Sequence, residues 1–126
     1  MATENYCGVS LGDYDGDEAS FYTERHVKAR KVHRCHECRE DIAKGDHYYV
    51  VSGKWEDEVM TYRFCGSCWE VMGEFSDRGR VFGVTWDTFH DEWASGATLQ
   101  GCLNRLSSVI AKQHMTRQWR KWKKLE

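Results

Sequence analysis

Two short cysteine pairs carry the clearest chemistry in this chain, Cys35-His36-Glu37-Cys38 and Cys65-Gly66-Ser67-Cys68. Two thiolates separated by two residues can hold one side of a metal ion, and a second such pair completes a tetrahedron. The spacing therefore predicts one structural Zn²⁺, with four ligands: Cys35, Cys38, Cys65 and Cys68. Because four thiolates leave no coordination position for water or substrate, we expect the metal to stabilise the fold rather than to catalyse.

Other interpretations of the cysteines fit less well. Two disulfides would suit a secreted protein, but the chain shows no secretory signal peptide. A thioredoxin-like motif needs one C-x-x-C beside a βαβ pattern. His33 and His36 flank the first ligand and are alternative ligands. Of the two remaining cysteines, Cys102 lies on an apolar helical stripe and is expected to be a small buried residue. Cys7 is a reactive thiol, a further ligand or a surface residue, and we favour the last.

The length of the chain, its hydropathy and its charge limit the number of domains and the compartment that we expect. At 126 residues the chain is one domain, or a small domain with an attached helical part. No apolar run approaches the roughly 18 residues that span a membrane, and six cysteines without a signal peptide point to a reducing cytoplasm. The net charge is only −2, but residues 1–24 hold six acids and no Lys or Arg, whereas residues 112–125 hold six Lys or Arg and no acid.

The elements that must position the cysteines follow from local patterns. Residues 47–55 and 58–64 are rich in β-branched and aromatic side chains and predict a hairpin that returns Cys65 to Cys35. Ser67, followed by Glu70, has the spacing of a capping box at the start of a helix. Thr85 is expected to cap a second helix, and Thr98 a third that continues into the basic end. Its apolar stripe runs through Leu99, Cys102, Leu103, Leu106, Val109 and Ile110.

Together these elements predict a small α+β zinc protein of the treble-clef type, in which a knuckle, a β-hairpin and a helix are followed by two further helices. The expected division is an acidic arm over residues 1–24, a zinc module over 25–78 and a helical part over 79–126 that packs on the module and ends in a basic segment.

The segment from His33 to Cys68 also resembles a known group. The run Arg30-Lys31-x-His33-Arg34-Cys35-x-x-Cys38, the glycine turn at Gly45, and Arg63-x-Cys65-x-x-Cys68 are similar to small treble-clef or zinc-ribbon proteins of tailed bacteriophages and prophages. The resemblance covers residues 14–72. It implies a phage accessory protein that acts in the host cytoplasm, including by blocking defence systems in the manner of an anti-CRISPR protein.

Enzymatic activity is not expected, because no nucleophile and base are evidently paired and no histidine pair follows the hairpin as in HNH nucleases. The function that we favour is a non-enzymatic phage protein that binds and inhibits or redirects a host macromolecule, such as a CRISPR or other defence nuclease. Acidic and aromatic residues of the arm suit such a partner. The candidates are Asp13, Tyr14, Asp15, Asp17, Glu18 and Tyr22.

The alternative is a regulatory nucleic-acid-binding zinc protein. Basic residues before the first knuckle and at the end of the chain would contact phosphates, and tryptophans would stack on bases. A sequence pI of about 6.3 is low for such a protein, and the two tryptophans Trp119 and Trp122 equally suit a last core-facing helical turn. The candidates are Arg30, Lys31, Arg34, Arg117, Trp119, Arg120, Lys121, Lys123 and Lys124.

Overall fold

The computed structural model describes residues 5–11, 21–55, 57–76 and 83–125. Three strands form an antiparallel sheet in the order β1-β4-β5: β1 (Phe21–Lys28), β4 (His47–Trp55) and β5 (Glu58–Cys65). Strands β2 (His33–Arg34) and β3 (Asp41–Ile42) form a separate two-stranded ribbon. The helices are α1 (Gly66–Phe75), α2 (Thr85–Ala94), α3 (Leu99–Leu103) and α4 (Val109–Leu125). The predicted α+β class and the predicted hairpin are confirmed.

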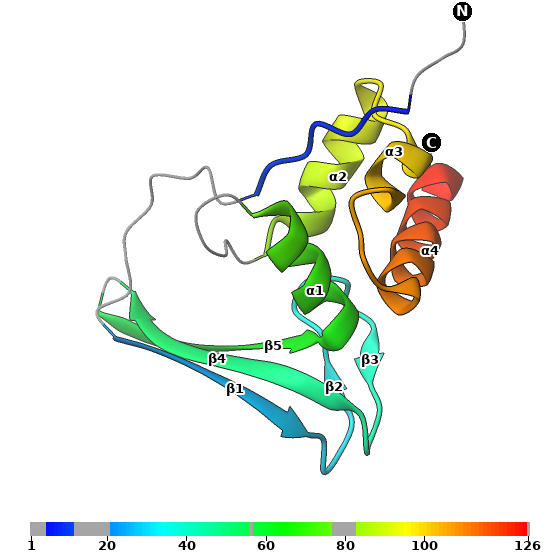
Figure 1. Cartoon of the computed structure of the whole chain (residues 1–126). Helices are drawn as coiled ribbons and strands as arrows, with labels where there is room; N and C mark the ends of the chain where they lie inside the picture. Colours follow the sequence, from blue (N-terminus) through cyan, green and yellow to red (C-terminus); the bar gives the residue numbers. More distant parts are fainter. Residues whose placement is uncertain (1–4, 12–20, 56, 77–82, 126) are drawn as a thin grey trace, which may run out of the picture.

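The two faces of the three-stranded sheet have different roles. Figure 1 shows the helices gathered on one side of the sheet. On that side Tyr49 and Phe64 place their rings 4.6 and 5.8 Å from the ring of Trp69 on α1, and Val51 is fully buried. Because side chains alternate along a strand, the neighbouring residue Val50 points to the opposite face, which the helices do not cover in Figure 1.

Strand β1 begins at Phe21 and pairs with β4 along its whole length. It therefore lies on both sides of the expected boundary between residues 24 and 25.

No helix in the described parts of the chain has the length and apolarity needed to cross a membrane.

The prediction of one long helix after Thr98 is wrong. Thr98 does cap α3, with its hydroxyl accepting from the Gly101 N–H, but α3 ends at Leu103. Helix α4 begins at Val109, where the Ser108 hydroxyl accepts from the Ala111 N–H at 3.0 Å. The break changes the direction in which the stripe points. Ala111, His114, Met115 and Gln118 are the buried residues of α4, whereas Val109 and Ile110 are 68% and 70% exposed.

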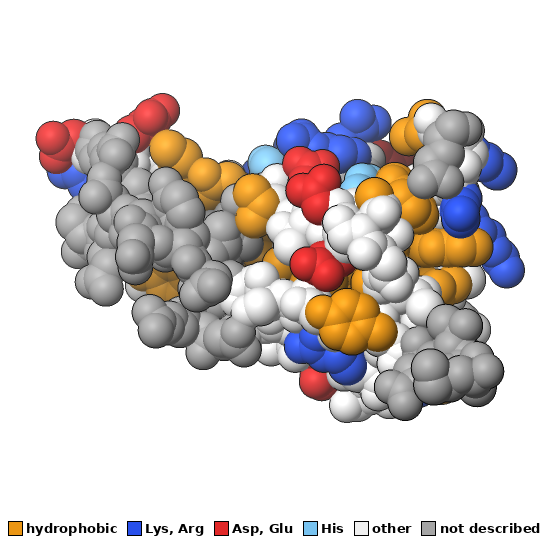
Figure 2. Space-filling view, turned by 90° about the horizontal axis from the view of Figure 1, so that it is seen from above, with side chains coloured by type: hydrophobic (Ala, Val, Ile, Leu, Met, Phe, Trp, Pro, Cys, Tyr) orange, Lys and Arg blue, Asp and Glu red, His pale blue; other side chains and the backbone are white. Residues whose placement is uncertain are grey.

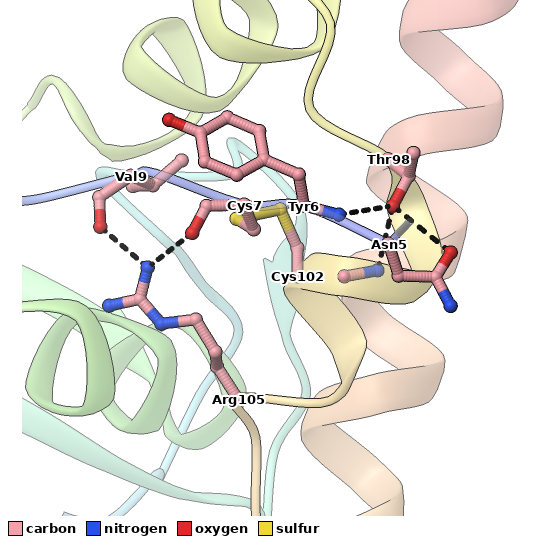
Figure 3. Close-up of a disulfide and its surroundings, with 8 residues drawn as sticks. Asn5, Tyr6, Cys7, Val9, Thr98, Cys102 and Arg105 are labelled. Carbon is pink, nitrogen blue, oxygen red and sulfur yellow. Dashed lines mark hydrogen bonds between the residues drawn. A yellow bond between two sulfur atoms is a disulfide. The ribbon is translucent and has the colours of Figure 1, made fainter. Parts of the chain in front are cut away.

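A disulfide between Cys7 and Cys102 ties the N-terminal strap, residues 5–11, to α3 (Figure 3). The Thr98 N–H donates to the carbonyl of Tyr6 at 2.7 Å. The Arg105 guanidinium donates to two strap carbonyls at 3.0 and 2.8 Å (Figure 3). The prediction that Cys102 is buried is confirmed, but the prediction that Cys7 is a surface residue is wrong. Disulfides are rare in reducing compartments, so this bond weighs against the inference of a reducing compartment from the cysteine count.

We expect loss of the disulfide to destabilise the fold without emptying the metal centre. Cys7→Ala/Cys102→Ala should lower the free energy of unfolding by about 2–4 kcal/mol, because the crosslink closes a long loop in the unfolded chain. Urea unfolding followed by circular dichroism measures this change, with zinc content as the control. Wild-type protein with the disulfide reduced should have the same urea midpoint as the variant. Identical midpoints for oxidised wild type and variant would show that the strap does not depend on the bond.

Candidate metal centre

The four predicted ligands lie together in the structure. The Sγ atoms of Cys35, Cys38, Cys65 and Cys68 are all within 4.8 Å of one another. None of these cysteines forms a disulfide. The Cys38 and Cys65 sulfurs are 4.0 Å apart, close to the roughly 3.8 Å that a tetrahedron with Zn–S bonds of about 2.3 Å requires. The residues therefore fit one metal ion with four sulfur ligands, for which zinc is the common choice.

Local backbone structure delivers the second pair of ligands. Cys65 ends β5 and caps α1, with its sulfur accepting from the Cys68 N–H at 3.4 Å. The Cys65 N–H in turn points at the Cys35 sulfur, also at 3.4 Å. The prediction of Ser67 as the cap is wrong because the helix begins at Gly66, so the thiol of Cys65 takes the position of the capping hydroxyl. These N–H groups offset part of the negative charge of thiolates.

The thiols cannot all ionise unless a cation is present. Hydrogen bonds from Cys38, Cys65 and Cys68 lower the pKa of Cys35. Burial raises the pKa of Cys68 well above its ordinary value. The metal-free cluster would therefore share its protons unequally. A bound metal ion replaces those protons, so its affinity should fall in acid.

Two helices far along the chain contact the ligand Cys68. The Trp86 Nε1–H of α2 donates to its sulfur at 3.3 Å. The Nε2 of His114 on α4 lies 3.2 Å from the same sulfur, and His114 is 3% exposed. Such contacts orient metal ligands and tune their charge. Neither contact of Trp86 or His114 with the metal centre was predicted from the sequence. Their only indication is a position on the inward face of a helix, which ordinary core residues share.

Glu40, two residues after the first ligand pair, attaches α4 to the metal centre. Its carboxylate forms ion pairs with Arg117 at 3.1 Å and with Lys121 at 3.0 Å, and it accepts from Gln118. Burial alone would raise the pKa of Glu40, but the hydrogen bonds from Lys121 and Arg117 hold it below its ordinary value. Glu40 also lies close to Cys38 and His114. Because its oxygens are engaged by α4, this group is an ion-pair network rather than a second metal site.

Glu37, between the first two ligands, caps α2. Its carboxylate accepts from the Thr85 N–H at 3.2 Å, from the Thr85 hydroxyl and from the Gly83 N–H. Burial raises the pKa of Glu37. The prediction that Thr85 caps this helix is wrong. Thr85 is the first helical residue, and the N-cap Val84 has no capping side chain, so a residue 48 positions away supplies the acceptor.

His36 is not placed as a zinc ligand. Its ring Nδ1 accepts from the backbone N–H of Arg63 at 2.8 Å, and the backbone N–H of His36 donates to the Arg63 carbonyl at 2.8 Å. His33, the other alternative ligand, packs its ring 5.1 Å from that of Tyr48. The knuckle thereby fixes the backbone of Arg63, which faces the uncovered side of the sheet.

A groove with a strongly basic lining occupies that side. It has a volume of about 1410 Å³ and runs along the sheet and the turn that follows β1. None of its described lining residues is acidic. We call it the basic groove, and its Lys and Arg side chains are Arg25, Lys28, Arg30, Lys31, Lys44 and Arg63.

The register places two of these cations in one row across the sheet. Arg25 pairs with Val50, and Val50 pairs with Arg63. Burial lowers the pKa of His33, and the positive charges of Arg63 and Lys31 lower it further. The buried Nε–H of Arg63 finds no acceptor among the described residues. The groove is therefore a region of positive potential whose lining, within residues 21–55 and 57–76, contains no acidic side chain.

The predicted nucleic-acid residues fall in two separate places. Arg30 and Lys31 line the basic groove, and Arg34 lies 3.9 Å from Asp41 beside it. The others belong to α4, where Arg117 and Lys121 pair with Glu40. Trp119 and Trp122 pack partly buried against the main core, which leaves them poorly placed to stack on bases. Arg120, Lys123 and Lys124 are exposed, and the Lys123 ammonium lies 5.8 and 5.5 Å from the two tryptophan rings.

Only one of the predicted protein-binding residues lies in a part of the chain that the structure describes. Asp13, Tyr14, Asp15, Asp17 and Glu18 lie outside the described residues. Tyr22 lies on β1, is 43% exposed and donates to the Glu24 carboxylate at 2.6 Å. Comparison with protein-family models, curated proteins and solved structures gives no match.

We expect the purified protein to contain one zinc ion in an all-sulfur site. Elemental analysis should give about one zinc per chain, and X-ray absorption should give about four sulfur neighbours near 2.3 Å. Cys65→Ser should lose the metal and unfold, because the binding energy of a structural zinc is folding energy. Cys7→Ser is the matched control and should keep its zinc. A Cys65→Ser protein with native stability and no zinc would contradict the assignment.

We expect Glu37→Ala to destabilise the junction between the knuckle and α2. The change leaves the buried N–H and hydroxyl of Thr85 unpaired, which costs about 1–3 kcal/mol. Glu37→Gln keeps one acceptor oxygen and should cost less. Glu58→Ala, at an exposed glutamate of β5, is the matched control and should change stability by less than about 0.5 kcal/mol. Urea unfolding with zinc present measures all three, and equal midpoints for Glu37→Ala and Glu58→Ala would exclude the capping role.

Proposed function

We propose that this protein is a non-catalytic, zinc-stabilised protein that binds nucleic acid in the basic groove. The observation that carries the proposal is the lining of that groove, which holds six Lys or Arg side chains and no acid among the described residues. Phosphate contacts from Lys and Arg supply most of the affinity of proteins for nucleic acids. A row of cations with few anionic partners of its own is therefore suited to a polyphosphate ligand.

The low net charge of the chain does not oppose this function, because binding depends on how charge is distributed. Figure 2 views the molecule from the helical side, where Asp and Glu side chains lie between the Lys and Arg side chains. On α4, Arg117 and Lys121 are already paired with Glu40. Among the residues that the structure describes, the lining of the basic groove has no such acids, so the sheet side is the better candidate for phosphate binding.

In this proposal the metal is zinc and its role is structural. When bound it would be held by Cys35, Cys38, Cys65 and Cys68, and it would supply the positive charge that lets four neighbouring thiolates coexist. The order of the knuckle, the β4–β5 hairpin and helix α1 supports a treble-clef arrangement as part of the same proposal. His36 of the knuckle holds the backbone of Arg63, which connects the metal centre to the groove.

The hypothesis of a phage accessory protein that inhibits a host nuclease stays a prediction. Of the candidate residues for that interaction, only Tyr22 lies among the described residues. Nucleic-acid binding and a phage origin are compatible. If the resemblance holds, the groove acts in the cytoplasm of a phage host.

Neutralising the groove should weaken binding, whereas neutralising α4 should not. We expect Arg25→Gln/Arg63→Gln to reduce affinity for a 20-base-pair DNA roughly 10- to 100-fold at 0.1 M salt, because two phosphate contacts are lost. Arg120→Gln/Lys124→Gln removes the same charge from α4 and should bind within about threefold of wild type. Fluorescence anisotropy with a labelled duplex measures both, with zinc content as the check on folding. Loss of binding in the α4 variant alone would place the interface on the helix and contradict the proposal.

A further inference from the structure

We infer that the basic groove takes the sugar–phosphate backbone of double-stranded nucleic acid and does so without reading base sequence. This inference rests on the proposed function and specifies its ligand. It depends on three features of the groove: its size, the placement of its cations across the sheet, and the absence of an exposed aromatic platform among its described lining residues.

The size of the groove fits a polymer better than a small ligand. Small-molecule pockets enclose about 300–1,000 Å³, whereas this groove has about 1410 Å³. Its lining includes Tyr48, Val50 and Ser52 of β4, and the extended chain from His47 to Ser52 spans about 16 Å at roughly 3.3 Å per residue. At about 3.4 Å of helix axis per phosphate of one strand, a duplex lying along the groove presents about five phosphates of each strand over that length.

The cations are spread across the sheet as well as along it. Arg25 on β1 and Arg63 on β5 stand on either side of Val50 in one register row. Their backbones are two strand spacings apart, which is about 9.6 Å. The two grooves of a DNA duplex are about 6 and 12 Å wide between their phosphate chains. A duplex can therefore place one phosphate chain near each arginine, whereas the single chain of an unpaired strand would have to cross the sheet to contact both.

The lining lacks the feature that single-strand binders use. Proteins that hold unpaired strands stack bases on exposed aromatic rings. Tyr48 is the one Phe, Trp or Tyr among the described lining residues, and it is only 6% exposed, with its ring against that of His33. The polar groups beside the cations are the hydroxyls of Ser52 and Thr61, 3.1 Å apart, and hydroxyls commonly contact phosphate and sugar. The groove thus offers backbone contacts without a stacking surface.

The test compares three probes of the same 20-base sequence: single-stranded DNA, double-stranded DNA and double-stranded RNA. Anisotropy titrations over 0.05–0.3 M salt should give tighter binding to both duplexes than to the single strand, by about tenfold or more. With up to six phosphate contacts, the slope of log K against log salt for duplex DNA should reach about −5. Lys28→Gln/Lys44→Gln should reduce that slope by about 2, and a second unrelated duplex should bind within about threefold of the first.

Failure of the inference and failure of the proposed function give different results in this experiment. Tighter binding of the single strand would overturn the duplex assignment and leave nucleic-acid binding intact. A preference of more than about tenfold for one duplex sequence would overturn the claim that binding is independent of base sequence, and would leave nucleic-acid binding intact. Failure of zinc-loaded wild-type protein to bind any of the three probes at 0.05 M salt would overturn both, as would binding only to an acidic polypeptide such as polyglutamate.

Discussion

The fold depends on one buried centre, in which four cysteine thiols from two distant segments of the chain come together. Cys35 and Cys68 are fully buried, and burial opposes their ionisation unless a cation is bound. A metal ion satisfies all four sulfurs at once and joins the knuckle to the start of α1. Two further helices attach to the same centre: α2 through Trp86 and α4 through His114. One interaction therefore holds together elements that a small apolar core would hold weakly.

The same centre positions the basic groove. Arg63 lies two residues before the ligand Cys65, and His36 between the first ligands binds the Arg63 backbone. The cationic turn from Lys28 to Lys31 leads directly into β2 and the first ligand. The metal would thus fix one side of the groove and the direction of the turn that forms another. The strap closed by the disulfide is tied to α3 and stabilises the helical side.

The parts of the fold with strong local patterns could be predicted from sequence. The ligand set, the β4–β5 hairpin and the Thr98 cap depend on spacing or on short-range hydrogen bonds. The Cys7–Cys102 bond could not be predicted, because nothing local links residues 95 positions apart. Glu37, Glu40 and His114 were missed for the same reason, since their roles come from tertiary contacts. The apolar stripe concealed the break between α3 and α4, because periodicity continues across a short turn. The groove was only partly foreseen, through Arg30 and Lys31, because its cations converge only when β1, β4 and β5 pair.

The most direct test of this account is a ¹H–¹⁵N correlation spectrum recorded before and after zinc is removed by a chelator at neutral pH, with the disulfide kept intact. The account predicts that the dispersed amide signals of α1, α2 and α4, and those of Arg25 and Arg63 in the groove, collapse together and return when zinc is restored. A chelated protein that contains no metal and retains the full native spectrum would contradict the claim that the four-cysteine centre holds the fold together.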